Sequence, residues 1–133
     1  MRLTVGVIIA ALAVALSVNW KETGALERLT ICQLKETPSR AEAESVVVRA
    51  TYTSDGRHFA LLIDKACGES RNTLRVGVDD SESSRLLWRK WEAECKSRGD
   101  EGLCVFSKRV EVVGRVRVDD DGLFFDISSM SEL

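Results

Sequence analysis

Imidazole chemistry in this chain depends on one residue, because His58 is the single histidine. Asp55 and Asp64 lie close to it in the sequence, and a histidine beside a carboxylate can form a general acid–base pair. His58 also follows a turn signal, Ser54-Asp55-Gly56, which favours an exposed surface histidine. No Gly-x-Ser-x-Gly nucleophile motif occurs in the chain. We therefore predict no catalytic residue and a protein that is not an enzyme.

Arginines on expected strands offer a second kind of chemistry, the binding of an anion. Arg49 and Arg75 are expected to point outward from the sheet, with His58 near them. Arginines beside a histidine can hold an anionic ligand through charge-assisted hydrogen bonds. The alternative is that these side chains are ordinary solvated strand residues, and the sequence leaves it open. Arg49, His58 and Arg75 are our candidate ligand-binding residues.

Nucleic acid, metals and cofactors find little support in the sequence. The net charge of −2 gives no basic excess, and the aromatic residues Tyr52 and Phe59 are expected to face inward rather than to stack on bases. The run Asp119-Asp120-Asp121 lacks the alternating oxygen ligands and distal glutamate of a calcium loop, so it predicts a solvated hairpin turn. We predict no nucleic-acid partner, no metal site and no cofactor.

The four cysteines predict disulfide bonds. Successive cysteines are 35, 28 and 9 positions apart, whereas zinc sites prefer closely spaced pairs. Four cysteines in a small exported domain are typical of two disulfides, for which three connectivities are possible. We favour Cys32 with Cys67, which ties the leading segment to the middle of the fold, and Cys95 with Cys104, which closes a short local loop.

The amino-terminal residues predict export. Arg2 precedes an apolar run, Leu3 to Val18, that is shorter than the roughly 20 residues of a spanning helix. We therefore expect a signal peptide within residues 1–17, with cleavage before Leu16 or, as a second choice, before Val18, and a periplasmic or secreted protein. The alternative is an uncleaved anchor, in which residues 1–18 tether the protein to the inner membrane.

Hydrophobic periodicity divides the remaining chain into a leading segment, a barrel and a tail. Residues 18–44 form a polar leading segment with a short helical turn, residues 45–128 the barrel, and residues 129–133 a tail. The expected elements of the barrel alternate like strands or repeat like a helix. They are strands over residues 45–53, 57–64, 73–78, 104–118 and 123–127, and a helix over residues 82–96.

The pattern within these elements predicts which side chains form the core. In the first strand Val46, Val48, Ala50 and Tyr52 are expected inward; in the second Phe59, Leu61 and Ile63; and in the third Leu74, Val76 and Val78. Asp79, Asp80 and Ser81 offer caps for the helix, in which Leu87, Trp88 and Trp91 are expected to contact the core rather than form a ligand platform. Val112-Val113-Gly114 interrupts the fourth strand and predicts a bulge or sharp bend.

The element order is strand, strand, strand, helix, strand, strand. This order predicts a five-stranded, OB-fold-like Greek-key barrel, a mainly β protein with one helix that closes an end of the barrel. The stretch from Cys32 through Pro38, Val46–Val48 and Asp55-Gly56 to Cys67, with Val110–Val118 later, resembles small exported bacterial proteins of uncharacterised function that have OB-like barrels. The resemblance implies a fold and specifies no activity.

We expect an exported binding module, because OB-folds bind oligonucleotides or oligosaccharides on one strand face and adjoining loops. Its ligand would be a small anion or another protein of the cell envelope. The alternative is a structural or interaction protein of the envelope that takes no small ligand.

Overall fold

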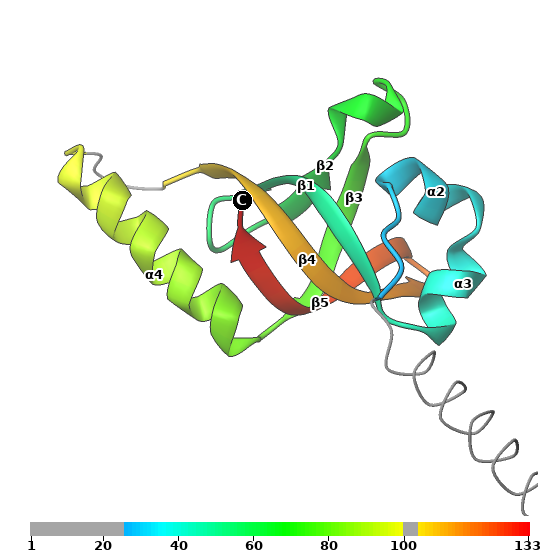
Figure 1. The fold of residues 1–133 in the computed structure, drawn as a ribbon. Coiled ribbons are helices and arrows are strands. Elements are labelled where there is room, and N and C mark those ends of the chain that lie inside the picture. The colour runs from blue at the N-terminus through cyan, green and yellow to red at the C-terminus, as the bar shows by residue number, and fades with distance from the viewer. Residues whose placement is uncertain (1–25, 100–103) are drawn as a thin grey trace, which may run out of the picture.

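The computed structural model describes residues 26–99 and 104–133 (Figure 1). The predicted signal segment, residues 1–17, lies outside the described residues. The elements that follow are two short helices, a barrel interrupted by a longer helix, and one 3-10 turn. In chain order they are α2 (Ile31–Glu36), α3 (Pro38–Ala43), β1 (Val46–Ser54), β2 (Ala60–Ile63), η1 (Lys65–Cys67), β3 (Thr73–Asp79), α4 (Glu82–Ser97), β4 (Phe106–Asp119) and β5 (Gly122–Glu132).

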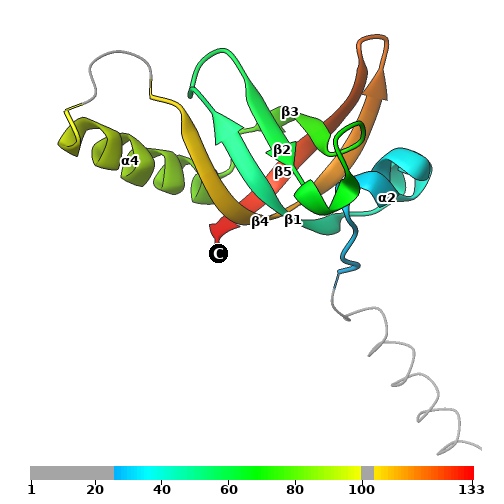
Figure 2. The same ribbon diagram turned by 90° about the horizontal axis from the view of Figure 1, so that it is seen from above.

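The five strands close into a barrel in the order β1-β2-β3-β5-β4, with β4 returning to β1. All neighbouring pairs are antiparallel except β3 with β5. The predicted fold, a five-stranded OB-fold-like barrel with a helix between its third and fourth strands, is confirmed. α4 lies at one end of the barrel, and α2 and α3 lie at the other (Figures 1 and 2).

The barrel core follows the alternation of β1 and β4. Val46, Val48, Ala50 and Tyr52 are all buried, as predicted, and β4 contributes Val110, Val112 and Val116. Because β-branched side chains pack well on a pleated surface, these valines favour strand and core together. Trp91 of α4 is fully buried and lies 5.9 Å from Tyr52 and 6.0 Å from Phe106, measured between ring centroids. The helix therefore joins the core through Trp91.

The predicted inward face of β2 is wrong. Leu62 is fully buried, whereas Phe59 is 41% exposed. The physical reason is the connection from β1: residues 55–59 form a five-residue loop rather than a tight turn, so the strand begins at Ala60. The resulting register pairs Leu62 with Tyr52, which puts both side chains on the inner face.

An irregularity at the end of β3 changes a second inward prediction. The register of β3 against β5 shifts between Val76 and Asp79, and Val78 is 52% exposed instead of buried. A bulge inserts residues without a cross-strand partner and re-aims the side chains after it. Asp79 is one of the side chains that this irregularity positions.

The predicted bulge in β4 is confirmed, because its register against β5 shifts between Val113 and Gly114. A Cβ at Gly114 would meet the backbone carbonyl oxygen of Asp126 and lie 2.9 Å from Cε1 of Phe125. Glycine is therefore required by close approach of the neighbouring strand.

The predicted tail over residues 129–133 is also wrong, because β5 continues to Glu132. Met130 is buried opposite Val112, and the Met130 backbone N–H donates to Ser83 Oγ of α4 at 3.0 Å. The serines in this stretch made it look like a polar tail in the sequence, but it is a strand that pairs with the first half of β4. The C-terminal residues thus belong to the barrel and anchor α4.

Two helices, rather than one helical turn, occupy the end of the leading segment. Thr30 and Gln33 form a capping box at the start of α2, and Pro38 begins α3, where its missing N–H is not needed. Ile31 and Leu34 are fully buried, so α2 joins the core through these two side chains.

Both favoured disulfide pairings are confirmed. Cys32–Cys67 links α2 to η1, and Cys95–Cys104 links the end of α4 to the approach to β4. Two disulfides in a chain of this size are typical of an oxidising, exported environment. Within the described ranges, no helix combines the length and apolar character needed to cross a membrane.

Candidate ligand-binding site

Two of the predicted ligand-binding residues already have partners within the barrel. Arg49 donates from Nε to Glu111 Oε2 at 2.8 Å across β1 and β4. Arg75 donates to the carbonyl oxygen of Asp121, and its guanidinium lies 4.2 Å from the centroid of the Phe124 ring. These contacts are those of outward strand residues on an OB-like barrel.

The structure does not bring Arg49 and Arg75 together. Thr53 of β1 pairs with Leu61 of β2, which pairs with Arg75 of β3, whereas Arg49 lies four residues before Thr53. Four strand residues cover roughly 13 Å, and β3 is two strand spacings, roughly 10 Å, from β1. The two arginines therefore do not form one anion site.

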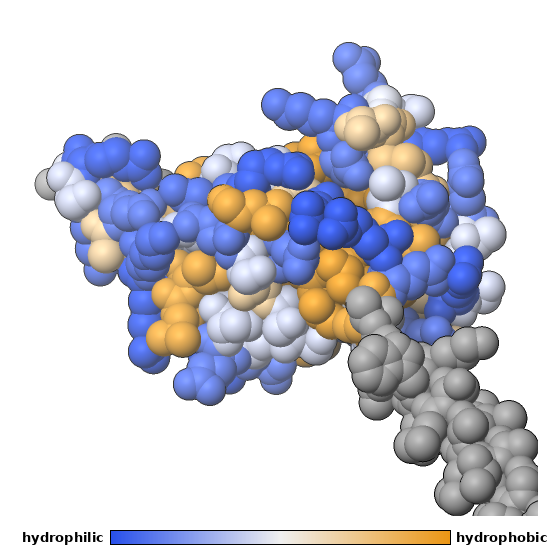
Figure 3. Space-filling view, in the orientation of Figure 1, coloured by the Kyte–Doolittle hydropathy of each residue, from blue (hydrophilic) through white to orange (hydrophobic). Residues whose placement is uncertain are grey.

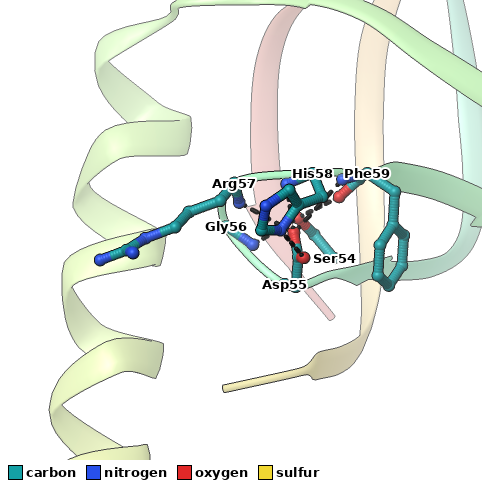
Figure 4. A network of polar contacts seen from close by, with 6 residues as sticks. All are labelled: Ser54, Asp55, Gly56, Arg57, His58 and Phe59. Atoms are coloured by element: carbon teal, nitrogen blue, oxygen red, sulfur yellow. Dashed lines mark hydrogen bonds and ion pairs between the residues drawn. The ribbon is translucent and has the colours of Figure 1, made fainter. Parts of the chain in front are cut away.

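His58 lies in the loop between β1 and β2, where Asp55 organises the backbone (Figure 4). Asp55 Oδ1 accepts hydrogen bonds from the N–H groups of Arg57 at 2.8 Å, His58 at 2.6 Å and Phe59 at 3.2 Å. Ser54 Oγ accepts from Gly56 N and donates to the Phe59 carbonyl. Because these bonds satisfy the loop from within, the loop is held in one conformation.

The Asp55 carboxylate also fixes the imidazole of His58, with Oδ2 lying 2.7 Å from Nδ1. Desolvation acts to raise the pKa of Asp55, but the hydrogen bonds from the Arg57 and His58 amides and from the imidazole lower it well below its usual value. The carboxylate is therefore ionised and holds Nδ1–H, leaving Nε2 toward solvent. Asp64 does not take part, because it caps η1 by accepting from Ala66 N.

This pair has no nucleophile beside it. The buried Ser54 hydroxyl in the same loop donates to the Phe59 carbonyl instead of to the imidazole, and no other described hydroxyl is hydrogen-bonded to His58. A triad needs the nucleophile hydrogen-bonded to the base. The arrangement of Asp55 and His58 is consequently one that orients a side chain at a surface.

A cleft of about 270 Å³ lies beside this loop. Its walls come from the loop between β1 and β2, the end of β3 and one turn of α4, which all meet on the α4 side of the barrel (Figure 2). The volume is slightly below the usual range for drug-sized ligands, about 300–1,000 Å³. The residues that line it are Tyr52, Ser54, Gly56, Arg57, His58, Phe59, Ala60, Val76, Gly77, Asp79 and Trp88.

Two aromatic residues and one acid form the polar inner part of the cleft. Trp88 Nε1 donates to the Tyr52 hydroxyl at 3.2 Å. Both carboxylate oxygens of Asp79 are buried and have no hydrogen-bond partner among the described residues. The Ser81 hydroxyl, which caps α4, donates to Ser84 Oγ at 2.8 Å, and both hydroxyls lie near the Asp79 carboxylate.

Burial dominates the electrostatics of this inner part. Desolvation raises the pKa of Asp79, the nearby Ser84 and Ser81 hydroxyls lower it in part, and Asp80 raises it further. Desolvation likewise raises the pKa of Tyr52; Ser54 and Trp88 oppose this rise, and Asp79 adds to it. A titratable group with a shifted pKa in the wall of a cleft is a mark of a binding or catalytic site.

Among the predicted candidates, only His58 lines the cleft. Sequence reasoning missed Asp79, which was expected as one of the helix caps, whereas the observed cap is Ser81. Trp88 packs against the core, as predicted, but it is half-buried and also lines the cleft, which sequence reasoning missed. The available sequence signal was the pair Asp79 and Asp80 before the helix, but two acidic residues at this position are equally typical of helix capping.

On the face shown in Figure 3, hydrophilic side chains divide the apolar surface into separate patches. Among the described residues, no group of histidine, cysteine or acidic side chains is arranged to hold a metal ion. No family model matches the chain, and comparisons with curated proteins and with solved structures likewise find no match.

Proposed function

We propose that this protein is an exported, non-catalytic binding module that holds a small ligand in the cleft between the β1–β2 loop, the end of β3 and α4. The observation that carries this proposal is the Asp79 carboxylate in the cleft wall, whose buried oxygens have no hydrogen-bond partner in the described part of the chain. A buried polar group without a partner is costly, and a ligand that supplies a donor removes that cost.

The organisation of the loop supports the same proposal. Asp55 and Ser54 hold the backbone of residues 55–59 through five hydrogen bonds that use no solvent. A wall that is already ordered loses little entropy when a ligand binds. Arg57 and His58 lie on this ordered wall. We therefore expect these two residues, rather than the separated Arg49 and Arg75, to bind an anionic group of the ligand.

The compartment that we propose is the periplasm or the extracellular medium. The two disulfides support it, because they persist in oxidising surroundings. The alternative, a chain tethered to the inner membrane by residues 1–18, presents the same cleft to the same compartment. The ligand is accordingly expected to be a small molecule of the cell envelope or its surroundings.

The test is a binding survey by NMR on the oxidised, ¹⁵N-labelled protein. The probes are propionate, phosphate, propylamine, glycine, γ-aminobutyrate and glucose, each at millimolar concentration. We expect at least one probe to shift the Trp88 indole N–H and the Gly56 and Gly77 amides. The Trp91 indole N–H, which donates to Glu132 outside the cleft, is the internal control.

If no probe shifts the cleft signals, the small-ligand function is refuted. The remaining function is then a structural or interaction protein of the envelope. A shift of equal size at Trp88 and Trp91 would also contradict the proposal, because it would report a change in the whole fold.

A further inference from the structure

The inner end of the cleft is suited to one kind of ligand group, a slim hydrogen-bond donor with positive charge. No described residue forms a well-placed hydrogen bond to the Asp79 oxygens, which are buried near the Ser81 and Ser84 hydroxyls. A primary ammonium is small, carries three N–H donors and forms strong hydrogen bonds to a carboxylate. A quaternary ammonium has no donor and is too broad for a recess.

The walls beside Asp79 are aromatic. Tyr52 and Trp88 both line the cleft, and their polar atoms are joined by the bond from Trp88 Nε1 to the Tyr52 hydroxyl. The faces of such rings attract cations, more strongly where water is excluded. A cationic group that approaches Asp79 therefore meets favourable surroundings on its way.

The outer end of the same cleft has the opposite charge. Arg57 lines the cleft, and in Figure 4 it extends from the loop in the direction of α4, whereas Phe59 points the other way. Among the residues that the structure describes, its guanidinium forms no ion pair, in contrast to Arg49 and Arg117. A guanidinium matches the two oxygens of a carboxylate.

We propose that the cleft binds a small zwitterion of the amino-acid type, with its primary ammonium on Asp79 and its carboxylate on Arg57. This inference rests on the proposed function, since it names the ligand class of the same cleft. The opposed charges at its two ends and the volume of about 270 Å³ exclude polyanions and large ligands.

The test compares probes that carry both charges with probes that carry one. Glycine, β-alanine and γ-aminobutyrate differ in the separation of their charged ends; propylamine and propionate each keep one end; and tetramethylammonium lacks donors. Calorimetry and NMR titration of the oxidised protein measure their affinities. We expect one of the three zwitterions to bind about tenfold tighter or more than propylamine or propionate.

Matched variants locate the two ends. Asp79→Asn and Arg57→Gln should each weaken the best zwitterion by about tenfold or more. The controls Asp120→Asn and Arg49→Gln change the same residue types outside the cleft and should leave the affinity unchanged. Intermolecular NOEs from the ligand methylene beside the ammonium to the Trp88 ring provide a test that needs no variant.

Equal affinity for zwitterions and single-charge probes would overturn the inference while leaving the proposed function intact. Retained affinity in Asp79→Asn, or equal losses in Asp79→Asn and Asp120→Asn, would also overturn it. NOEs that place the ammonium away from Trp88 would do so even if a variant failed to fold. The absence of any shift in the cleft, by contrast, refutes the proposed function itself.

Discussion

The C-terminal strand should make a measurable contribution to stability through one side chain, Glu132. Its Oε1 accepts from the indole N–H of the fully buried Trp91 at 2.8 Å, and its Oε2 accepts from Lys90 at 2.8 Å. Glu132→Ala leaves the indole N–H without a partner, which costs about 1–3 kcal/mol of unfolding free energy. Glu132→Gln keeps an acceptor for Trp91 and loses only the ion pair with exposed Lys90, so it should cost much less.

Urea unfolding of the oxidised protein, followed by far-UV circular dichroism, measures these changes. Glu92→Ala removes a carboxylate that pairs only with exposed Lys96, and it should leave the midpoint nearly unchanged. If Glu132→Ala unfolds at the wild-type midpoint, Glu132 does not anchor α4. If Glu132→Gln loses as much as Glu132→Ala, the charge rather than the acceptor matters, and the reasoning from Trp91 is refuted.

The dependence of stability on acidic pH is a second test of the same contact. The hydrogen bonds from Lys90 and then from Trp91 lower the pKa of Glu132 below its usual value. Its ionised form therefore contributes stability above the ordinary pKa of glutamate, and this contribution is lost as the pH falls through the lowered pKa. Glu132→Gln should lose less stability than wild type over that acidic range.

Three further predictions concern other parts of the fold. Asp55→Ala removes the acceptor for three loop amides, and hydrogen exchange at residues 56–59 should accelerate while the barrel amides keep their protection. Gly114→Ala should destabilise the protein by about 1–3 kcal/mol or more in urea, because the added Cβ meets the backbone of Asp126; unchanged stability would show that β5 can move aside. Cys32→Ala with Cys67→Ala opens a loop of 35 residues and should cost about 4 kcal/mol; a much smaller loss would refute the entropic account.

Much of the barrel could be predicted because its strands alternate in a way that the core preserves. The inward residues of β1, the break at Gly114 and the position of α4 all follow from local patterns of valine, glycine and capping residues. The sequence could not predict which face of β2 points inward, because both alternating sets of residues contain large apolar side chains. One set holds Phe59, Leu61 and Ile63, and the other holds Leu62. The length of the preceding loop decides between the two faces, and hydrogen bonds to Asp55 set that length.

The candidate site was less predictable, because it depends on elements that only the tertiary fold brings together. His58 was found from its residue type, and the neighbouring Arg57 was not singled out because exposed arginines are common. Asp79 follows a strand and precedes a helix cap, which gives it an ordinary structural role on sequence grounds. The tertiary fold places it with Tyr52 and Trp88 in the wall of a cleft, where burial raises its pKa.

The same burial predicts a conflict between stability and binding at Asp79. Desolvation raises its pKa, so the stability linked to its protonated form is full below the ordinary pKa of aspartate and is lost as the pH rises through the raised pKa. At neutral pH Asp79→Asn should therefore be at least as stable as wild type, with a flatter dependence of melting temperature on pH, while the control Asp120→Asn in the turn between β4 and β5 follows wild type. Lower stability of Asp79→Asn at neutral pH would mean that the protein itself supplies hydrogen bonds to this carboxylate. A ligand would then not be needed to supply them.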